Sequence, residues 1–243
     1  MSGEARRPLI LGNWKLHGLG TDLPEIARID AAVARLGVDA GLMLPATLVE
    51  RAARQVRALA IGGQDCHPAA GGAHTGGVAA AMLRDAGATI TLAGHSETRD
   101  DGLSVAAKAR AAQAAGLAVV VCVGESERSA DARALVAAQL RASLPPELDW
   151  SRAAIAYEPV WCIGGNAVPD AAHLARIFEM LRVEAGTAPL LYGGAVDGGN
   201  AAALLALPEV DGLLVGRASR SAADFVPVLE AAAARQGQPA FSE

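Results

Sequence analysis

The sequence predicts an α/β fold in which residues 1–243 form a single domain, a closed (β/α)8 barrel. Short, nearly continuous apolar runs alternate with alanine-rich stretches of helical spacing along the whole chain. Uninterrupted apolar strands are expected where a parallel sheet is buried on both faces. The alternation occurs eight times without a linker or low-complexity tract, which favours a closed barrel over an open sheet.

The expected strands are short apolar runs bounded by glycine or polar residues. In chain order they are residues 9–12, 40–44, 58–62, 89–93, 118–123, 153–157, 190–192 and 212–215. The expected helices have apolar residues at helical spacing. They are residues 24–36, 47–56, 78–86, 104–115, 130–142, 170–185, 198–206 and 222–235. An open dinucleotide-binding sheet is disfavoured because the first strand continues into Gly12-Asn13-Trp14-Lys15 and not into a Gly-x-Gly-x-x-Gly turn.

Composition and charge restrict the class of protein. The chain is 52% hydrophobic with a net charge of −5, and without a block of like charges it is not expected to bind nucleic acid or an anionic membrane. We expect neither a signal peptide nor a membrane span, because no apolar run is long enough. The cysteines Cys66, Cys122 and Cys162 match no zinc-binding spacing. These features predict a cytoplasmic protein with reduced cysteines and no bound metal.

A candidate base lies at the end of the sixth strand, in the segment from Ala156 to Gly165. Glu158 is placed at the strand tip, and Pro159 restricts the start of the next segment. Gly164 and Gly165 give this segment backbone freedom, which is typical of a lid over a catalytic group. The alternative is an ordinary glutamate that faces solvent.

Other polar groups follow other strands, and in a barrel of this class active-site residues come from the carboxyl ends of the strands. Asn13 and Lys15 follow the first strand, and His95 and Glu97 follow the fourth. Together with Glu158 they form a set of one carboxylate, one imidazole and one ammonium group. Such a set suits proton abstraction next to a carbonyl group, with the imidazole and the ammonium stabilising the enediolate.

Each of these residues also has a simpler interpretation. His95 is either an electrophile or a structural histidine, and Lys15 is either a substrate ligand or a surface lysine. Glu97 either pairs with Lys15 or carries a proton. We expect Ser96 and Glu97 to begin a helix whose N–H groups point at one ring nitrogen of His95 and keep the imidazole neutral. Cys122 is expected to be a packed thiol and not a nucleophile.

An anion site is expected after the last two strands. Gly193 and Gly194 precede Ala195, and Gly216 precedes Arg217. We expect short helices to follow, so that main-chain amides and helix termini face a phosphate group. Phosphate sites of barrels usually lie after these two strands, and Gly164 is a candidate for a further amide.

These residues resemble the motifs of the triosephosphate isomerase family, in order and in spacing. The resemblance covers about residues 8–235 and rests on Asn13-Trp14-Lys15, Gly94-His95-Ser96-Glu97, Cys122-Val123-Gly124-Glu125, Tyr157-Glu158-Pro159-Val160-Trp161, Ile163-Gly164, Tyr192-Gly193-Gly194 and Val215-Gly216. It implies interconversion of dihydroxyacetone phosphate and D-glyceraldehyde 3-phosphate, without cofactor or metal.

The resemblance also implies a role for each residue. Glu158 would be the base, neutral His95 the electrophile, and Lys15 and Asn13 substrate ligands. The phosphate would rest on amides of Gly164, Ala195, Gly216 and Arg217, under a lid of residues 159–167. The family usually has Ser at the position of Ala195 and Gly at that of Arg217, and its second lid hinge differs from Gly165-Asn166-Ala167. These departures leave open an alternative, a weakened or inactive phosphate-binding barrel with a binding or assembly role.

The glycine-rich insert is similar to the loop through which family members dock into a second subunit. This similarity implies a homodimer formed through residues 65–79. The family has Glu at the position of Gly77 and Arg at that of Thr98, a pair expected to form a salt bridge. Because both charges are missing here, neither is left buried and unpaired.

Overall fold

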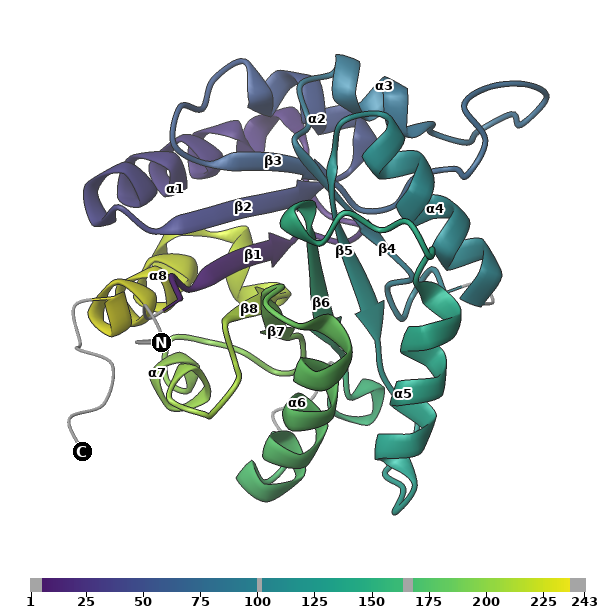
Figure 1. Ribbon diagram of the computed structural model, residues 1–243. Coiled ribbons are helices and arrows are strands. Elements are labelled where there is room, and N and C mark those ends of the chain that lie inside the picture. The colour runs from purple at the N-terminus through teal and green to yellow at the C-terminus, as the bar shows by residue number, and fades with distance from the viewer. Residues whose placement is uncertain (1–5, 100–101, 164–167, 237–243) are drawn as a thin grey trace.

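The computed structural model describes residues 6–99, 102–163 and 168–236, which form a barrel of parallel strands surrounded by helices (Figure 1). The described strands are β1 (Leu9–Asn13), β2 (Asp39–Leu44), β3 (Ala60–Gly63), β4 (Ile90–Ala93), β5 (Ala118–Val123), β6 (Ala153–Tyr157), β7 (Leu190–Tyr192) and β8 (Gly212–Val215). The helices are α1 (Leu23–Leu36), α2 (Ala46–Ala53), α3 (Ala80–Asp85), α4 (Gly102–Ala114), α5 (Ala132–Ser143), α6 (Ala171–Ala185), α7 (Ala201–Leu205) and α8 (Ala222–Gln236).

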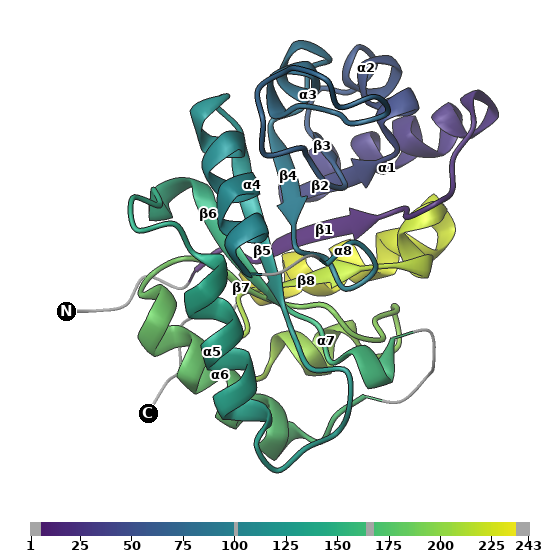
Figure 2. The same ribbon diagram turned by 90° about the vertical axis from the view of Figure 1, so that its right-hand side faces the viewer.

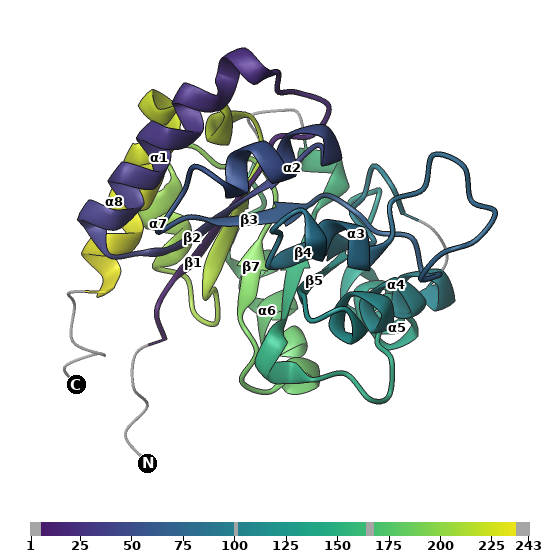
Figure 3. The ribbon, with the colours of Figure 1, turned by 90° about the horizontal axis from the view of Figure 1, so that it is seen from above.

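The barrel is closed by the first and last strands. Each strand pairs in parallel with its neighbours in chain order, and Leu9 of β1 is in register with Asp39 of β2 and with Gly212 of β8. The helices form an outer ring, in which α5 lies beside α6 (Figure 2) and α1 beside α8 (Figure 3). The predicted closed (β/α)8 barrel is therefore confirmed.

Alternating residues of the strands fill two separate apolar layers. Leu11, Met43, Leu92, Val120 and Leu214 belong to a cluster inside the barrel. The residues between them point outward and join a larger cluster under the helices. Because side chains alternate along a strand, a polar residue that continues the inward series is directed to the mouth of the barrel.

Several expected helix boundaries are wrong, and two helices are clearly shorter than their apolar pattern. The helix predicted over residues 78–86 is only Ala80–Asp85, and that over 198–206 is only Ala201–Leu205. Residues 198–200 instead form a turn, in which the side chain of Asp197 accepts the amides of Gly199 and Asn200. Asp and Asn side chains compete in this way with the first turn of a helix.

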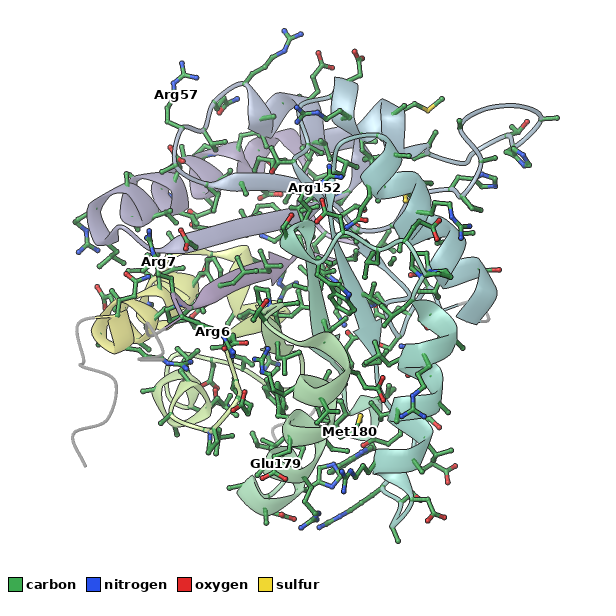
Figure 4. The ribbon with its side chains drawn as sticks, in the orientation of Figure 1. Arg6, Arg7, Arg57, Arg152, Glu179 and Met180 are labelled. Atoms are coloured by element: carbon green, nitrogen blue, oxygen red, sulfur yellow. The ribbon has the colours of Figure 1, made fainter. Side chains whose placement is uncertain are left out.

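An ion-pair network lies at the amino-terminal rim of the barrel, where β8 begins. Figure 4 shows Arg6 and Arg7 at the start of β1. The buried carboxylate of Asp211 accepts from Arg6 at 3.2 Å, from the amide of Leu190 at 3.0 Å and from Arg182. Because this rim is remote from the carboxyl ends of the strands, its network is assigned to stability.

Asp211→Ala is expected to lower the free energy of unfolding by about 3 kcal/mol, because it leaves the Arg182 guanidinium without a buried carboxylate partner. Urea titrations of the parent and the variant, at the same protein concentration, measure this difference in the free energy of unfolding. The matched control is Asp39→Ala, which removes an exposed ion pair with Arg7 and should cost about 1 kcal/mol or less. Equal losses in the two variants would contradict the assignment.

A long irregular segment connects β3 to α3 and projects from the barrel (Figure 3). It is closed at its base, where the amide of His67 donates to Val78 O at 2.7 Å. Residues 71–77 are exposed. Within the described part of the chain, no helix has the length and apolar character required to cross a bilayer.

Candidate active site

A cavity of about 460 Å³ lies at the carboxyl ends of the strands. Its lining includes every predicted site residue that the structure describes: Asn13, Lys15, His95, Glu97, Glu158, Ala195, Gly216 and Arg217. The predicted ligand Gly164 and the second lid hinge, residues 165–167, lie outside the described residues. The volume suits a small molecule.

Glu158 continues the inward series of β6. Ala154 and Ala156 are part of the cluster inside the barrel, whereas Tyr157 packs outward. The next inward position is Glu158, which is only 1% exposed. Its amide donates to Val123 O at 2.7 Å, so the neighbouring strand fixes the backbone from which the carboxylate extends into the cavity.

His95 and Glu158 are in direct contact. Gly94 has a φ of 74°, a conformation that favours glycine, and this turn brings the His95 ring to the site. His95 Nδ1 accepts the amide of Glu97 at 3.2 Å, and His95 Nε2 lies 3.0 Å from Glu158 Oε1. Because the accepting nitrogen carries no hydrogen, the proton of a neutral imidazole is on Nε2 and is donated to the carboxylate. The other carboxylate oxygen, Oε2, accepts the amide of Ser96 at 3.0 Å.

The expected helix start at Ser96 and Glu97 is wrong, since residues 96–98 form a turn. The turn is closed by the amide of Thr98, which donates to His95 O at 2.8 Å. It still directs the Glu97 N–H at the imidazole, so the expected donor is present although the helix is not.

Lys15 and Asn13 enter the cavity from β1, while Trp14 between them packs into the outer layer. Lys15 has a φ of 54°, which is uncommon for a residue with a Cβ and typical of functional sites. Its Nζ lies 2.5 Å from Glu97 Oε1, so the pairing interpretation of Glu97 agrees with the geometry. Sequence reasoning missed Gln64, whose amide donates to Asn13 Oδ1 at 3.2 Å and to Lys15 O at 2.8 Å.

The segments that follow β7 and β8 line one end of the cavity. Gly216 leads directly into a short 3-10 helix, Arg217–Arg220. The helix expected after Gly194, over residues 198–206, begins only at Ala201. A Cβ at Gly216 would lie 3.8 Å from Lys15 Cε, so the lysine stem runs towards this end. This end of the cavity is therefore lined by main-chain groups of the two turns and not by the terminus of a long helix.

A second polar cluster, whose contacts were not predicted from the sequence, lies behind Glu158. Glu125 Oε1 accepts from Tyr157 Oη and from Trp161 Nε1, both at 2.8 Å. His173 Nε2 is 2.9 Å from Tyr157 Oη, and the Arg128 guanidinium lies over the Trp161 ring. Burial, and then the Glu125 charge, raise the pKa of the Tyr157 hydroxyl, so this group remains a hydrogen-bond donor.

The cysteines are buried and free. Cys122 belongs to the cluster inside the barrel, and burial raises the pKa of its thiol well above the usual value. The prediction of a packed thiol is confirmed. Burial raises the pKa of Cys162 to about 11, so this thiol is protonated at neutral pH. No group of three or more possible metal ligands lies together among the described residues.

Comparison with known proteins identifies close relatives. The family model described as triosephosphate isomerase matches residues 8–232. A triosephosphate isomerase of Ruegeria sp. (strain TM1040) is 47% identical over 94% of this chain and 99% of the relative, and one of Xanthobacter flavus is 46% identical over 93% and 98%. A crystal structure of triosephosphate isomerase from Bartonella henselae superimposes with a TM-score of 0.86 at 36% identity, covering 93% of this chain and 98% of the other.

Proposed function

Because this chain belongs to the triosephosphate isomerase family, we propose that Glu158, His95 and Lys15 share the chemistry of its isomerase reaction. The chain is an isomerase that interconverts dihydroxyacetone phosphate and D-glyceraldehyde 3-phosphate, a step of glycolysis and gluconeogenesis. The observation that supports these roles is the 3.0 Å contact between His95 Nε2 and Glu158 Oε1 in a cavity that also contains Lys15.

The proposed reaction moves one proton between neighbouring carbons. Glu158 removes a proton from the carbon next to the carbonyl group, and the electron pair of that C–H bond forms the double bond of an enediolate. His95 donates its Nε2–H to the oxygen that gains charge, and the Lys15 ammonium stabilises the same charge. Glu158 then returns a proton to the neighbouring carbon, while the hydroxyl proton on the first carbon passes through His95 Nε2 to the other oxygen, so that the first oxygen becomes the carbonyl and the second the hydroxyl. No other reactant is needed for this balance.

When the substrate binds, the hydrogen bond between His95 and Glu158 in the free site has to be replaced by one between His95 and the substrate. The Nε2–H of His95 is donated to Glu158 Oε1, and Ser96 N–H to Oε2. When a substrate oxygen accepts the Nε2–H, Oε1 is released to act as base. Asn13 contacts both the Lys15 amide and the Gln64 side chain. These contacts support a role for Asn13 in fixing the shape of the part of the cavity that binds the substrate.

The phosphate group is proposed to bind amides of Ala195, Gly216 and Arg217, with Gly164 as a further ligand and residues 159–167 as the lid. The three described residues line the cavity, and main-chain N–H groups suit phosphate oxygens. Because an amide is retained at each position, the departures from the family at Ala195 and Arg217 do not remove these donors.

Ala195→Ser is expected to tighten phosphate binding, because the added hydroxyl can donate one more hydrogen bond to the anion. The gain of about 0.5–1.5 kcal/mol corresponds to a roughly 2- to 10-fold lower inhibition constant for inorganic phosphate. Competition by phosphate in the isomerase assay measures it. Weaker inhibition in the variant would contradict the position assigned to residue 195.

A coupled assay with D-glyceraldehyde 3-phosphate tests the roles as a set. Turnover that is abolished or strongly reduced in Glu158, His95 and Lys15 variants supports them. The alternative, a phosphate-binding barrel without catalysis, predicts phosphate binding without turnover in the parent protein. The close relatives disfavour it.

We also propose a homodimer formed through residues 65–79. The support is the exposed segment that projects between β3 and α3, together with its similarity to a family docking loop. Light scattering at micromolar concentration should give twice the chain mass of 24.6 kDa, and the mass of one chain would refute the proposal. A cytoplasmic location is proposed from the reaction, and cell fractionation tests it.

A further inference from the structure

His173 contacts the residue before the segment that carries Glu158 and one residue within that segment. This segment, Glu158–Ile163, is called the hinge segment here. On one side, His173 Nε2 lies 2.9 Å from the hydroxyl of Tyr157, the residue directly before Glu158. On the other side, the His173 ring packs edge-on against Trp161, with ring centroids 6.1 Å apart. No other part of the proposed mechanism uses this histidine.

The directions of the hydrogen bonds in this cluster follow from the groups present. The carboxylate oxygen Glu125 Oε1 has no hydrogen and accepts from both Tyr157 Oη and Trp161 Nε1. The single hydroxyl hydrogen of Tyr157 is therefore used, so Tyr157 Oη accepts from His173 Nε2–H. The series runs from His173 to Tyr157 to Glu125, and hydrogen bonds in such a series strengthen one another.

The position of His173 is itself well determined. Its amide donates to the Asp170 side chain at 2.8 Å, which caps the start of α6. Asp170 also pairs with Arg128 at 3.1 Å, and the Arg128 guanidinium lies 5.8 Å from the centroid of the Trp161 ring. The start of α6 thus positions His173 and Arg128 against the Trp161 side chain of the hinge segment.

Glu158 itself is held by Val123 O, His95 and Ser96, but the rest of the hinge segment has two hydrogen bonds to other segments among the described residues. The amide of Val160 donates to Glu125 O at 3.0 Å, and the indole of Trp161 donates to Glu125 Oε1. Both bonds end on Glu125. The second oxygen of that carboxylate, Oε2, is buried without a hydrogen-bond partner among the described residues. The orientation of the Glu125 carboxylate therefore depends on the donors at Oε1, and Tyr157 is one of the two.

We propose that His173 is a positioning residue for the isomerase, which holds the Tyr157 hydroxyl and the Glu125 carboxylate in place for Trp161 and thereby fixes the hinge segment that carries Glu158. This role rests on the proposed function of Glu158 as the base. His173 thus affects the proton transfer by Glu158, although His173 itself exchanges no proton with the substrate.

The experiment compares His173→Leu, which removes the N–H donor, with His173→Gln, which keeps one. The first readout is the indole N–H resonance of Trp161 in the NMR spectrum of the free protein, assigned by its loss in Trp161→Phe. We expect it to shift in His173→Leu and in Tyr157→Phe, and to return towards the parent position in His173→Gln. The indole resonances of Trp14 and Trp150 should stay in place.

The second readout is the split between kcat and KM. We expect His173→Leu to lower kcat by about 10- to 100-fold, since a small misplacement of a catalytic group has effects of this size, while KM changes less than about 2-fold. His173→Gln should recover most of kcat. Met180→Leu is the matched control: Met180 is a buried residue further along the same helix (Figure 4), and its replacement should change neither readout.

Three results would overturn the proposal. An unmoved Trp161 resonance in His173→Leu would show that the histidine does not hold the hinge segment. Equal shifts in His173→Leu and His173→Gln would exclude the hydrogen bond as the cause, and a shift with unchanged kcat would exclude a role in the reaction. Because the resonance is measured without substrate, it decides the structural part even if Glu158 is not the base.

Discussion

Glu158→Gln is expected to lower kcat by about 10²–10⁴-fold, because the amide cannot accept the substrate proton. The replacement keeps the size of the side chain and the positions of its two terminal heavy atoms. One of these must then be an NH₂ group, which faces either His95 Nε2–H or the Ser96 amide where an oxygen accepts now. We therefore expect the loss in kcat to be accompanied by a smaller change in KM.

The measurement is steady-state kinetics in both directions of the isomerisation, with the fold checked by circular dichroism. Glu158→Asp is the matched control, since it keeps the carboxylate and withdraws it by one methylene group. Its kcat should lie between those of the parent and Glu158→Gln. A Glu158→Gln protein with nearly parental kcat would exclude Glu158 as the base.

The fold and the position of Glu158 could be predicted from local patterns, because strand β6 indicates both the parallel sheet and the direction of the residue that follows it. In β6 the sequence Ala153–Tyr157 is apolar on both faces, as in a parallel strand, and Glu158 continues its inward series. The same argument places Asn13 after Leu11 in β1. Where a functional group extends a strand pattern, its direction follows from the alternation alone.

Contacts between distant segments could not be predicted in this way. Gln64 reaches Asn13 and Lys15 across 51 and 49 residues of sequence, and nothing in its own surroundings indicates this. Tyr157 and Glu125 meet because β5 and β6 are neighbours. Both residues belong to motifs that carry the resemblance, but neither motif indicates this contact. Ser96 and Glu97 form a turn and not the expected helix start, because residues that favour the start of a helix also favour turns.

Lys15→Met is expected to lower kcat/KM by about 10²–10³-fold, since it removes a cation aimed at the charge that develops in the transition state. Methionine has a similar length and shape, so packing against the cavity wall is retained. The left-handed backbone at this residue, with a φ of 54°, carries a side chain in both proteins. The loss thus reports the charge and not the fold.

Glu97 decides how that loss is interpreted, because Lys15→Met leaves its carboxylate unpaired at the cavity. The Lys15 and Glu97 side chains are 27% and 52% exposed, and an ion pair this accessible to water contributes about 0–1 kcal/mol. Glu97→Gln alone should therefore reduce kcat by less than about 10-fold if its role is to pair with Lys15. A loss of about 10² or more would instead support proton transfer by Glu97.

The double variant Lys15→Met/Glu97→Gln separates the two effects of removing the ammonium group. An unpaired Glu97 carboxylate repels the substrate phosphate, and this repulsion is absent in the double variant. We expect its KM to return towards the parental value while kcat remains low, because the Lys15 ammonium group is absent from both variants. Full recovery of kcat would show that Lys15 acts only by neutralising Glu97, and transition-state stabilisation would then have to come from His95 alone.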